Sequence, residues 1–237
     1  KSLNEALDHA GIVNLAKVEI HMIDAVKITK ANVAKILKSY QAVLVPGGFG
    51  SRGIEGMIFA CEFARKNKLP YFGICLGMQI AIIEFSRNVL KLKNANSTEF
   101  NIKTKYPVIG LVTEWKDASG KIEHRDENSN LGGTMRLGGQ KCLVKRNSLS
   151  HKLYKKLTIT ERHRHRYEVN PEYKNELIAG GMDIVGTSLD GNLAEMIEIK
   201  KHPWFLGCQF HPEFTSNPRD GHPIFNDFIA KAIKIKR

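Results

Sequence analysis

The feature that most constrains this chain is a five-residue turn, Gly73-Ile74-Cys75-Leu76-Gly77, between two apolar segments. The run Tyr71–Ile74 is typical of a buried strand, and the apolar residues from Met78 onward recur at helical spacing. A G-x-C-x-G sequence at a strand-to-helix junction is the thiol counterpart of the G-x-S-x-G nucleophile elbow. We therefore predict that Cys75 projects from a sharp turn, where the helix N-terminus favours its thiolate.

The cysteine content limits the other chemistry that this chain can carry, because a cysteine in an apolar run is more often a packing residue than a nucleophile. Cys61, Cys75, Cys142 and Cys208 lie far apart and form no CxxC pair, so neither a zinc site nor a disulfide framework is indicated. We expect no metal site and a reducing, cytoplasmic environment. No apolar run has the length of a membrane span and no signal peptide is visible, so we expect no membrane partner.

Strand-like and helix-like segments alternate along the first half of the 237-residue chain. Helices are predicted at 2–9, 32–40, 54–66 and 224–233, and strands at 18–22, 42–45, 108–112, 184–188, 194–199 and 204–210. Residues 117–139, rich in Asp, Asn and Gly, are predicted to form a long mobile loop. We expect one α/β domain over 1–237, with a doubly wound, mostly parallel sheet flanked by helices, a flavodoxin-like core and an antiparallel extension.

The predicted strand at 204–210 ends in His211-Pro212-Glu213. A cysteine nucleophile needs a base that takes its proton, and the base needs a carboxylate that orients it. Pro212 favours an extended backbone at His211, which places His211 and Glu213 on one face. A histidine at a strand end is more often structural, so the prediction of a Cys75–His211–Glu213 triad depends on the elbow and on a third motif.

The third motif is Pro46-Gly47-Gly48-Phe49-Gly50, which follows the predicted strand at 42–45. Its glycines leave backbone N–H groups open at the end of the sheet, where they can bind the oxyanion of an acyl intermediate. A simple tight turn has the same composition, so this motif counts only together with the other two.

The formal net charge of +12 raises the question of a nucleic-acid partner. The basic residues are scattered through four regions, however, and aromatic residues are not interleaved with them. A solvated surface that faces an acidic partner domain or an anionic nucleotide is the better interpretation. We expect no nucleic-acid partner, and a nucleic-acid-binding domain stays as an alternative that the charge alone supports.

Taken together, the three motifs resemble those of the class I, or triad, glutamine amidotransferases. Further similarity, to the glutaminase domain of the CTP synthase family, lies in the segments 96–100, 130–138 and 161–170. The resemblance covers essentially the whole chain. It implies that Cys75 attacks the side-chain amide of L-glutamine, forming a γ-glutamyl thioester and releasing ammonia. His211 is implied to act as acid and base, oriented by Glu213.

The resemblance also implies an oxyanion hole formed by the backbone amides of Gly48 and Leu76. The residues implied to bind glutamine are Gly48, Phe49, Leu76, Gly77, Met78, Gln79, Glu99 and Arg166. The chemistry agrees in kind, because a carboxylate such as Glu99 suits the ammonium of an amino acid and a guanidinium such as Arg166 suits its carboxylate. Segment 125–139 resembles the lid of the family, which is implied to order over the site when GTP activates the enzyme.

The family implies no cofactor in this domain itself. ATP, Mg²⁺ and UTP are implied for a synthetase domain of the same polypeptide, which we expect to be absent from this sequence together with the first strand of the amidotransferase domain. The ammonia then serves the ATP-dependent amination of UTP to CTP, GTP is the allosteric activator, and the full-length enzyme is a homotetramer. Two alternatives are a glutaminase domain that serves another synthetase, of GMP, carbamoyl phosphate or anthranilate, and a catalytically silent regulatory module.

Overall fold

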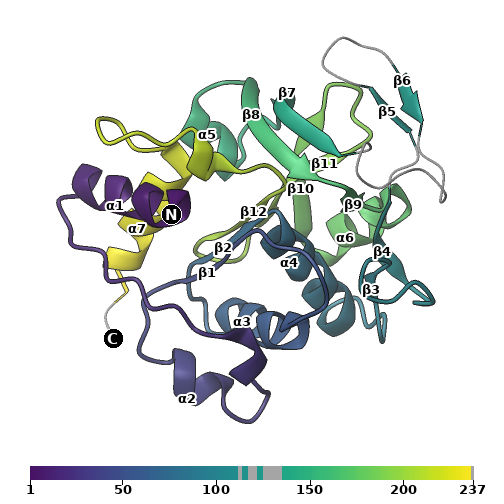
Figure 1. Ribbon diagram of the computed structural model, residues 1–237, viewed down its shortest axis with the longest axis horizontal. Helices are drawn as coiled ribbons and strands as arrows, with labels where there is room; N and C mark the ends of the chain where they lie inside the picture. The colour runs from purple at the N-terminus through teal and green to yellow at the C-terminus, as the bar shows by residue number, and fades with distance from the viewer. Residues whose placement is uncertain (112–113, 117–121, 125–134, 236–237) are drawn as a thin grey trace.

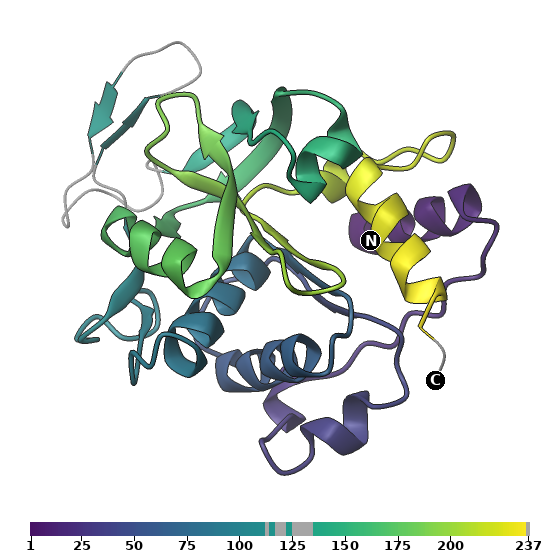
Figure 2. The same cartoon turned by 180° about the vertical axis from the view of Figure 1, so that it is seen from behind.

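A seven-stranded sheet forms the centre of the molecule, and helices cover both of its faces (Figures 1 and 2). The computed structural model describes residues 1–111, 114–116, 122–124 and 135–235. The strand order is β1-β2-β12-β11-β10-β7-β8. These strands are β1 (Val43–Val45), β2 (Tyr71–Ile74), β7 (Arg136–Val144), β8 (Thr158–His165), β10 (Met182–Ser188), β11 (Ala194–Ile199) and β12 (Phe205–Cys208).

The sheet has a parallel and an antiparallel part. Strand β2 pairs parallel with β1 and with β12, whereas β11, β10, β7 and β8 continue the sheet in antiparallel pairings. The α/β class and the antiparallel extension are therefore confirmed, but within the described residues the antiparallel part is larger than a mostly parallel sheet would have. The antiparallel part is larger than expected because of strands β7 and β8, whose residues have the sequence character of a loop and of a basic patch.

The helices form two layers, with α3 and α4 packed together on one face and α1 and α7 packed together on the other (Figures 1 and 2). Strand β2 divides the core between them: Tyr71 belongs to the cluster under α3 and α4, and Phe72 belongs to the cluster under α1 and α7. The helices are α1 (Ser2–Val13), α2 (Val33–Leu37), α3 (Ile54–Lys66), α4 (Leu76–Asn88), α5 (Leu149–Tyr154), α6 (Lys174–Gly180) and α7 (Pro223–Ile233). Short 3-10 turns occur at Ala25–Lys27, Pro171–Tyr173 and Pro212–Phe214.

Two smaller sheets lie beside the main one. The first contains β3 (Asn96–Ser97), β4 (Pro107–Leu111) and β9 (Tyr167–Val169), and the second is the pair of β5 (Glu114–Lys116) and β6 (Ile122–His124). Strand β9 follows β8 after a bend at Arg166, so the segment between the two strands connects the main sheet to the smaller one. In the part of the chain that the structure describes, no helix has the length and apolar character needed to cross a membrane.

Several sequence predictions are confirmed, among them the helix at Ile54–Lys66 and the strand at Tyr71–Ile74. The strand predicted at 18–22 is wrong, because its alternating side chains are not buried against a sheet and Met22 is 80% exposed. The predicted loop at 117–139 is wrong in part, because β6 and the start of β7 lie within it. Residues 117–121 and 125–134, which include most of the expected lid, lie outside the described residues.

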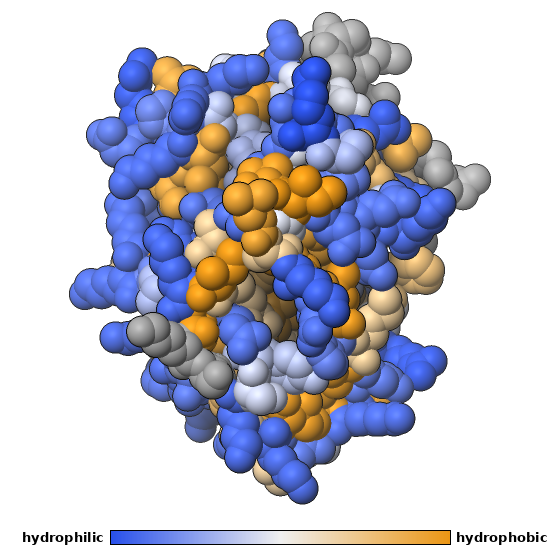
Figure 3. Space-filling view, turned by 90° about the vertical axis from the view of Figure 1, so that its left-hand side faces the viewer, coloured by the Kyte–Doolittle hydropathy of each residue, from blue (hydrophilic) through white to orange (hydrophobic). Residues whose placement is uncertain are grey.

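Figure 3 shows the face that carries α1 and α7, where hydrophilic residues cover most of the surface and apolar residues gather near the middle. On α1, Ile12 and Val13 are exposed, as is Leu15 just after the helix. The three motifs singled out in the sequence lie at the carboxyl ends of β1, β2 and β12.

Candidate active site

Cys75 occupies a strained turn between β2 and α4. Its φ of 52° and ψ of −103° lie in a region that non-glycine residues rarely adopt. The turn is held from both sides: the Cys75 N–H donates to the Cys208 carbonyl of β12 at 2.7 Å, and the Cys75 carbonyl accepts from Met78 and Gln79 at 3.1 and 3.2 Å. The elbow predicted from the sequence is present in the structure.

The two glycines of the elbow are required by close backbone contacts. A Cβ added at Gly73 would lie 2.5 Å from the Gly77 carbonyl oxygen, and one added at Gly77 would lie 2.0 Å from the Val45 carbonyl oxygen. Neither distance leaves room for a side chain, because the obstructing atoms belong to the backbone. The spacing of the G-x-C-x-G motif therefore follows from how tightly α4 packs against β1 and β2.

His211 and Glu213 meet beside the elbow. The His211 ring nitrogen Nδ1 lies 2.7 Å from Glu213 Oε1. The backbone N–H of His211 donates to the backbone carbonyl of Arg162 at 2.8 Å. A Cβ at Gly47 would lie 2.6 Å from His211 Cε1 and 3.5 Å from the Cβ of Cys75, so the imidazole and the thiol flank the same glycine. The sequence placed the histidine and the carboxylate on an extended segment, but Glu213 lies in the 3-10 turn Pro212–Phe214.

The thiol of Cys75 is buried, and burial raises its pKa to about 12. The Leu76 N–H opposes this shift by hydrogen bonding to the sulfur, while the charges of Glu213, Glu168 and Glu99 add to it. A thiol with such a pKa is protonated at neutral pH, so it needs an adjacent base before it can act as a nucleophile. In this geometry, His211 is the base at hand.

The candidate oxyanion hole lies where β1 ends and α4 begins. A Cβ at Gly48 would lie 3.1 Å from Leu76 Cδ2, so the two residues whose N–H groups the sequence assigned to this role are neighbours. Phe49 is 92% exposed at the rim. The next N–H, that of Gly50, donates to Glu99 Oε1 at 2.8 Å, which fixes the Glu99 carboxylate against the glycine turn.

The other residues assigned to glutamine differ in their positions. Arg166 directly precedes Tyr167 in the chain. Burial raises the pKa of the Tyr167 phenol, the charge of Glu99 raises it further and that of Arg166 lowers it. Gln79 is buried behind the elbow, and its amide nitrogen donates to the Tyr167 carbonyl at 3.0 Å. The Met78 side chain is buried in the core under Gly207, so it points away from the elbow.

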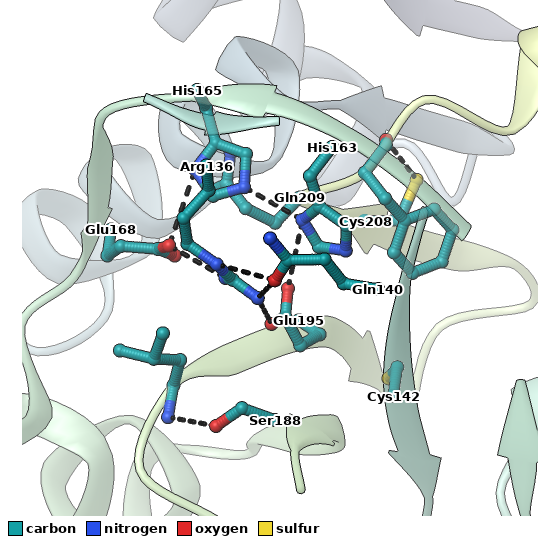
Figure 4. A network of polar contacts seen from close by, with 12 residues as sticks. Arg136, Gln140, Cys142, His163, His165, Glu168, Ser188, Glu195, Cys208 and Gln209 are labelled. Atoms are coloured by element: carbon teal, nitrogen blue, oxygen red, sulfur yellow. Dashed lines mark hydrogen bonds and ion pairs between the residues drawn. The ribbon is translucent and has the colours of Figure 1, made fainter. Parts of the chain in front are cut away.

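A buried polar cluster, which the sequence analysis missed, lies behind this site and contains Arg136, His163, His165, Glu168 and Glu195 (Figure 4). The Arg136 guanidinium lies 2.8 Å from an oxygen of each glutamate. The rings of the two histidines approach to 2.9 Å, His163 Nδ1 to His165 Nε2. Burial lowers the pKa of both histidines well below the usual range, with the charge of Arg136 acting in the same direction.

The cluster has the donor types of a metal site, since His163, His165 and Glu195 offer ligand atoms within 4.8 Å of one another. The guanidinium already compensates the Glu195 carboxylate at 2.8 Å, which disfavours a second cation. The signal for these buried residues in the sequence was a two-residue period. Glu161, His163 and His165 alternate with arginines along β8, and the side chains of these three residues are buried whereas the arginines are exposed. The density of charge in this run masks that period and makes the segment resemble a basic patch.

A cavity of about 560 Å³ lies next to the triad. Its lining includes Met135, Leu137, Arg162, Arg164 and Phe214. Phe214 also stacks on the His211 ring, with the ring centroids 5.3 Å apart. Phe214 therefore connects the cavity to His211.

Comparisons with known proteins agree with this geometry. The family model of class I glutamine amidotransferases matches residues 1–231. The glutaminase domain of Trypanosoma brucei CTPS with bound acivicin has 34% sequence identity and a TM-score of 0.88, and the match covers 100% of this chain and 88% of that one. A putative GMP synthase subunit from Thermoplasma acidophilum has 16% identity and a TM-score of 0.53, with 96% and 87% covered, which is a likeness in fold alone.

The resemblance to the glutaminase domain of CTP synthase, inferred from the motifs, is thus confirmed over the full length of the chain. The family match extends from α1 into α7 and includes all three motifs. This chain belongs to the class I glutamine amidotransferases.

Proposed function

We propose that this chain hydrolyses L-glutamine through a thioester on Cys75. The observation that carries the proposal is that Cys75 and His211 flank Gly47 while Glu213 holds the far side of the imidazole at 2.7 Å. His211 takes the thiol proton as the sulfur attacks the glutamine side-chain carbonyl carbon, and the N–H groups of Gly48 and Leu76 bind the oxyanion. The proton passes from His211 to the departing ammonia, and a water molecule then hydrolyses the thioester to glutamate.

Two further residues suit the rest of the substrate. Glu99 presents a carboxylate for the α-ammonium, and Arg166 presents a guanidinium for the α-carboxylate. The hydrogen bond of 2.8 Å from the Gly50 N–H to Glu99 Oε1, which holds Glu99 against the glycine turn, supports the assignment of Glu99. Phe49, at the exposed rim, is proposed to line the entrance.

A serine substitution at the nucleophile tests the chemistry, because Cys75→Ser changes a single atom. We expect loss of glutamine hydrolysis with an unchanged unfolding transition, and a glutamine-mimicking diazoketone should modify Cys75 in the parent and spare it when glutamine is added. Cys142→Ser and Cys208→Ser are matched controls, since both thiols are buried like Cys75 and lie outside the elbow. Retained hydrolysis in Cys75→Ser, or loss in a control that still folds, would place the nucleophile elsewhere.

We further propose that the ammonia serves CTP synthesis, which the 34% identity to a CTPS glutaminase domain supports. In this proposal a synthetase domain of the same polypeptide binds ATP, Mg²⁺ and UTP, GTP activates glutamine hydrolysis, and the complete enzyme is a cytoplasmic homotetramer. The complete polypeptide supplied with glutamine, ATP, Mg²⁺ and UTP should form CTP. Amination of xanthosine monophosphate instead of UTP would favour the alternative of a GMP-forming enzyme.

A further inference from the structure

A second polar group lies against the Cys75 sulfur, besides the Leu76 N–H at the start of α4. The side-chain Nε2 of Gln209 lies 3.6 Å from Cys75 Sγ, within hydrogen-bond reach of a sulfur acceptor. Gln209 is fully buried between β12 and His211, with 0% of its surface exposed. The neighbouring Cys208 carbonyl accepts the Cys75 N–H, so the short segment 208–211 contacts the elbow through both backbone and side chains.

The orientation of the Gln209 amide follows from a chain of hydrogen bonds. The Tyr167 backbone carbonyl can only accept, so the Gln79 side-chain atom 3.0 Å from it must be the nitrogen. That nitrogen lies 3.1 Å from the Gln209 side chain, whose facing atom must therefore be the oxygen. The remaining atom of the Gln209 amide, which faces Cys75, is then the N–H donor.

We propose that Gln209 is a further residue of the nucleophilic site, whose N–H holds the Cys75 sulfur in place and stabilises the thiolate formed when His211 removes its proton. This inference rests on the proposed function of Cys75. A hydrogen bond to a charged acceptor is stronger than one to a neutral acceptor, so the contact strengthens as the sulfur becomes a thiolate. The chain Tyr167–Gln79–Gln209–Cys75 also connects the nucleophile to Gln79.

The surroundings of the sulfur explain why such a donor matters. Burial disfavours the thiolate, and three carboxylates, Glu213, Glu168 and Glu99, act on Cys75 in the same direction. The Leu76 N–H acts the other way, and the His211 ring lies beside Gly47, next to the Cβ of Cys75. The side-chain N–H of Gln209 is a neutral donor that stabilises the thiolate together with the Leu76 N–H. The main chain of Gln209 is held separately, because its backbone N–H donates to the backbone carbonyl of Glu195 at 2.8 Å.

The substitution Gln209→Glu tests the inference sharply. It keeps the shape of the side chain and an oxygen for Gln79, but replaces the N–H that faces Cys75 by a second oxygen. We expect the rate constant for iodoacetamide alkylation of Cys75, mapped by mass spectrometry, to fall about tenfold, and its pH midpoint to rise by about one unit. Gln41→Glu makes the same chemical change on an exposed side chain and should react like the parent protein.

A second measurement needs no substitution at Gln209. The chain has four glutamines, so ¹⁵N labelling of glutamine side chains gives four amide pairs in an NMR spectrum. We expect Gln209 to shift most when Cys75 is alkylated, with Gln41 unmoved. The inference would be overturned if Cys75 in the Gln209→Glu variant reacted with iodoacetamide as fast as in the parent. It would also be overturned if the NMR signals of the Gln209 amide did not shift on alkylation of Cys75. Failure of the diazoketone to modify Cys75 in the parent would instead contradict the proposed function, and the NMR contact can be read in either case.

Discussion

Removing Arg136 should make the stability of this protein strongly dependent on pH. Arg136 is 3% exposed and pairs with Glu168 and Glu195, which are 1% and 0% exposed. Arg136→Met fills much of the same volume but leaves both buried carboxylates without their cation. Breaking a buried pair in this way costs about 3–5 kcal/mol.

The sign of the pH dependence follows from the pKa of the carboxylates. Burial already raises the pKa of Glu195, and Arg136 opposes that shift, so its loss raises the pKa further. The unfolded chain ionises Glu195 above about pH 4.3, whereas the folded variant keeps this carboxyl protonated to a higher pH. Each unit in this window lowers the free energy of unfolding by about 1.4 kcal/mol per carboxyl. Without Arg136, His163 and His165 are also easier to protonate at low pH, where they compensate the carboxylates.

Urea unfolding at about pH 5 and about pH 8, followed by tryptophan fluorescence and circular dichroism, measures this difference. We expect Arg136→Met to lose several kcal/mol at the higher pH and clearly less at the lower one. Arg219→Met is the control, because its ion pair with Asp220 is exposed and should contribute no more than about 0.5 kcal/mol. Equal losses at the two pH values would refute the reasoning that the carboxylates are left uncompensated.

Two further predictions concern packing at the elbow and a surface-facing ion pair. Gly77→Ala should lower the free energy of unfolding by about 3 kcal/mol or more, because its Cβ would lie 2.0 Å from the Val45 carbonyl oxygen. The control is Gly191→Ala, whose Cβ meets no atom within 4 Å but whose φ is +76°, and it should lose about 1 kcal/mol in the same urea titration. Equal losses in the two variants would contradict the steric argument. Burial raises the pKa of Asp183, but hydrogen bonds from Lys145 and Lys200 outweigh burial and lower the pKa overall. The stabilisation from these contacts is therefore present above about pH 4 and is lost as the pH falls. Asp183→Asn should therefore cost about 1 kcal/mol near pH 7 and almost nothing near pH 2, and a cost that persists in acid would show that the charge is not its origin.

The structure also separates the features that local sequence could predict from those that it could not. The strand at Tyr71–Ile74 and the helix at Ile54–Lys66 were predictable because their side chains are buried along a simple period. The segment at 18–22 has the same alternation, yet Met22 is exposed and no sheet is formed there. Periodicity reports which residues can be buried, and the presence of a neighbouring strand decides whether they are.

The sequence by itself determined the elbow, because the constraints on Gly73, Cys75 and Gly77 arise mainly within one strand–turn–helix unit. The distant groups that contribute are two backbone carbonyls, that of Val45 in β1 and that of Cys208 in β12. The sequence singled out His211 among the nine histidines through its His-Pro-Glu motif, but only the tertiary structure brings His211 and Cys75 to the same glycine, Gly47. The parallel pairing of β12 with β2, with Gly207 opposite Gly73, brings the end of one strand beside the end of the other.

The same holds for the groups that the sequence left unassigned. The contact of Gln209 with Cys75, and the burial of Arg136 between two glutamates, depend on segments that lie far apart along the chain. A charged or amide side chain is read as solvent-exposed until its partners are known, because burial without partners costs several kcal/mol. The partners of Arg136 come from β9 and β11, and those of Gln209 come from the elbow and α4. The fold alone brings these segments together.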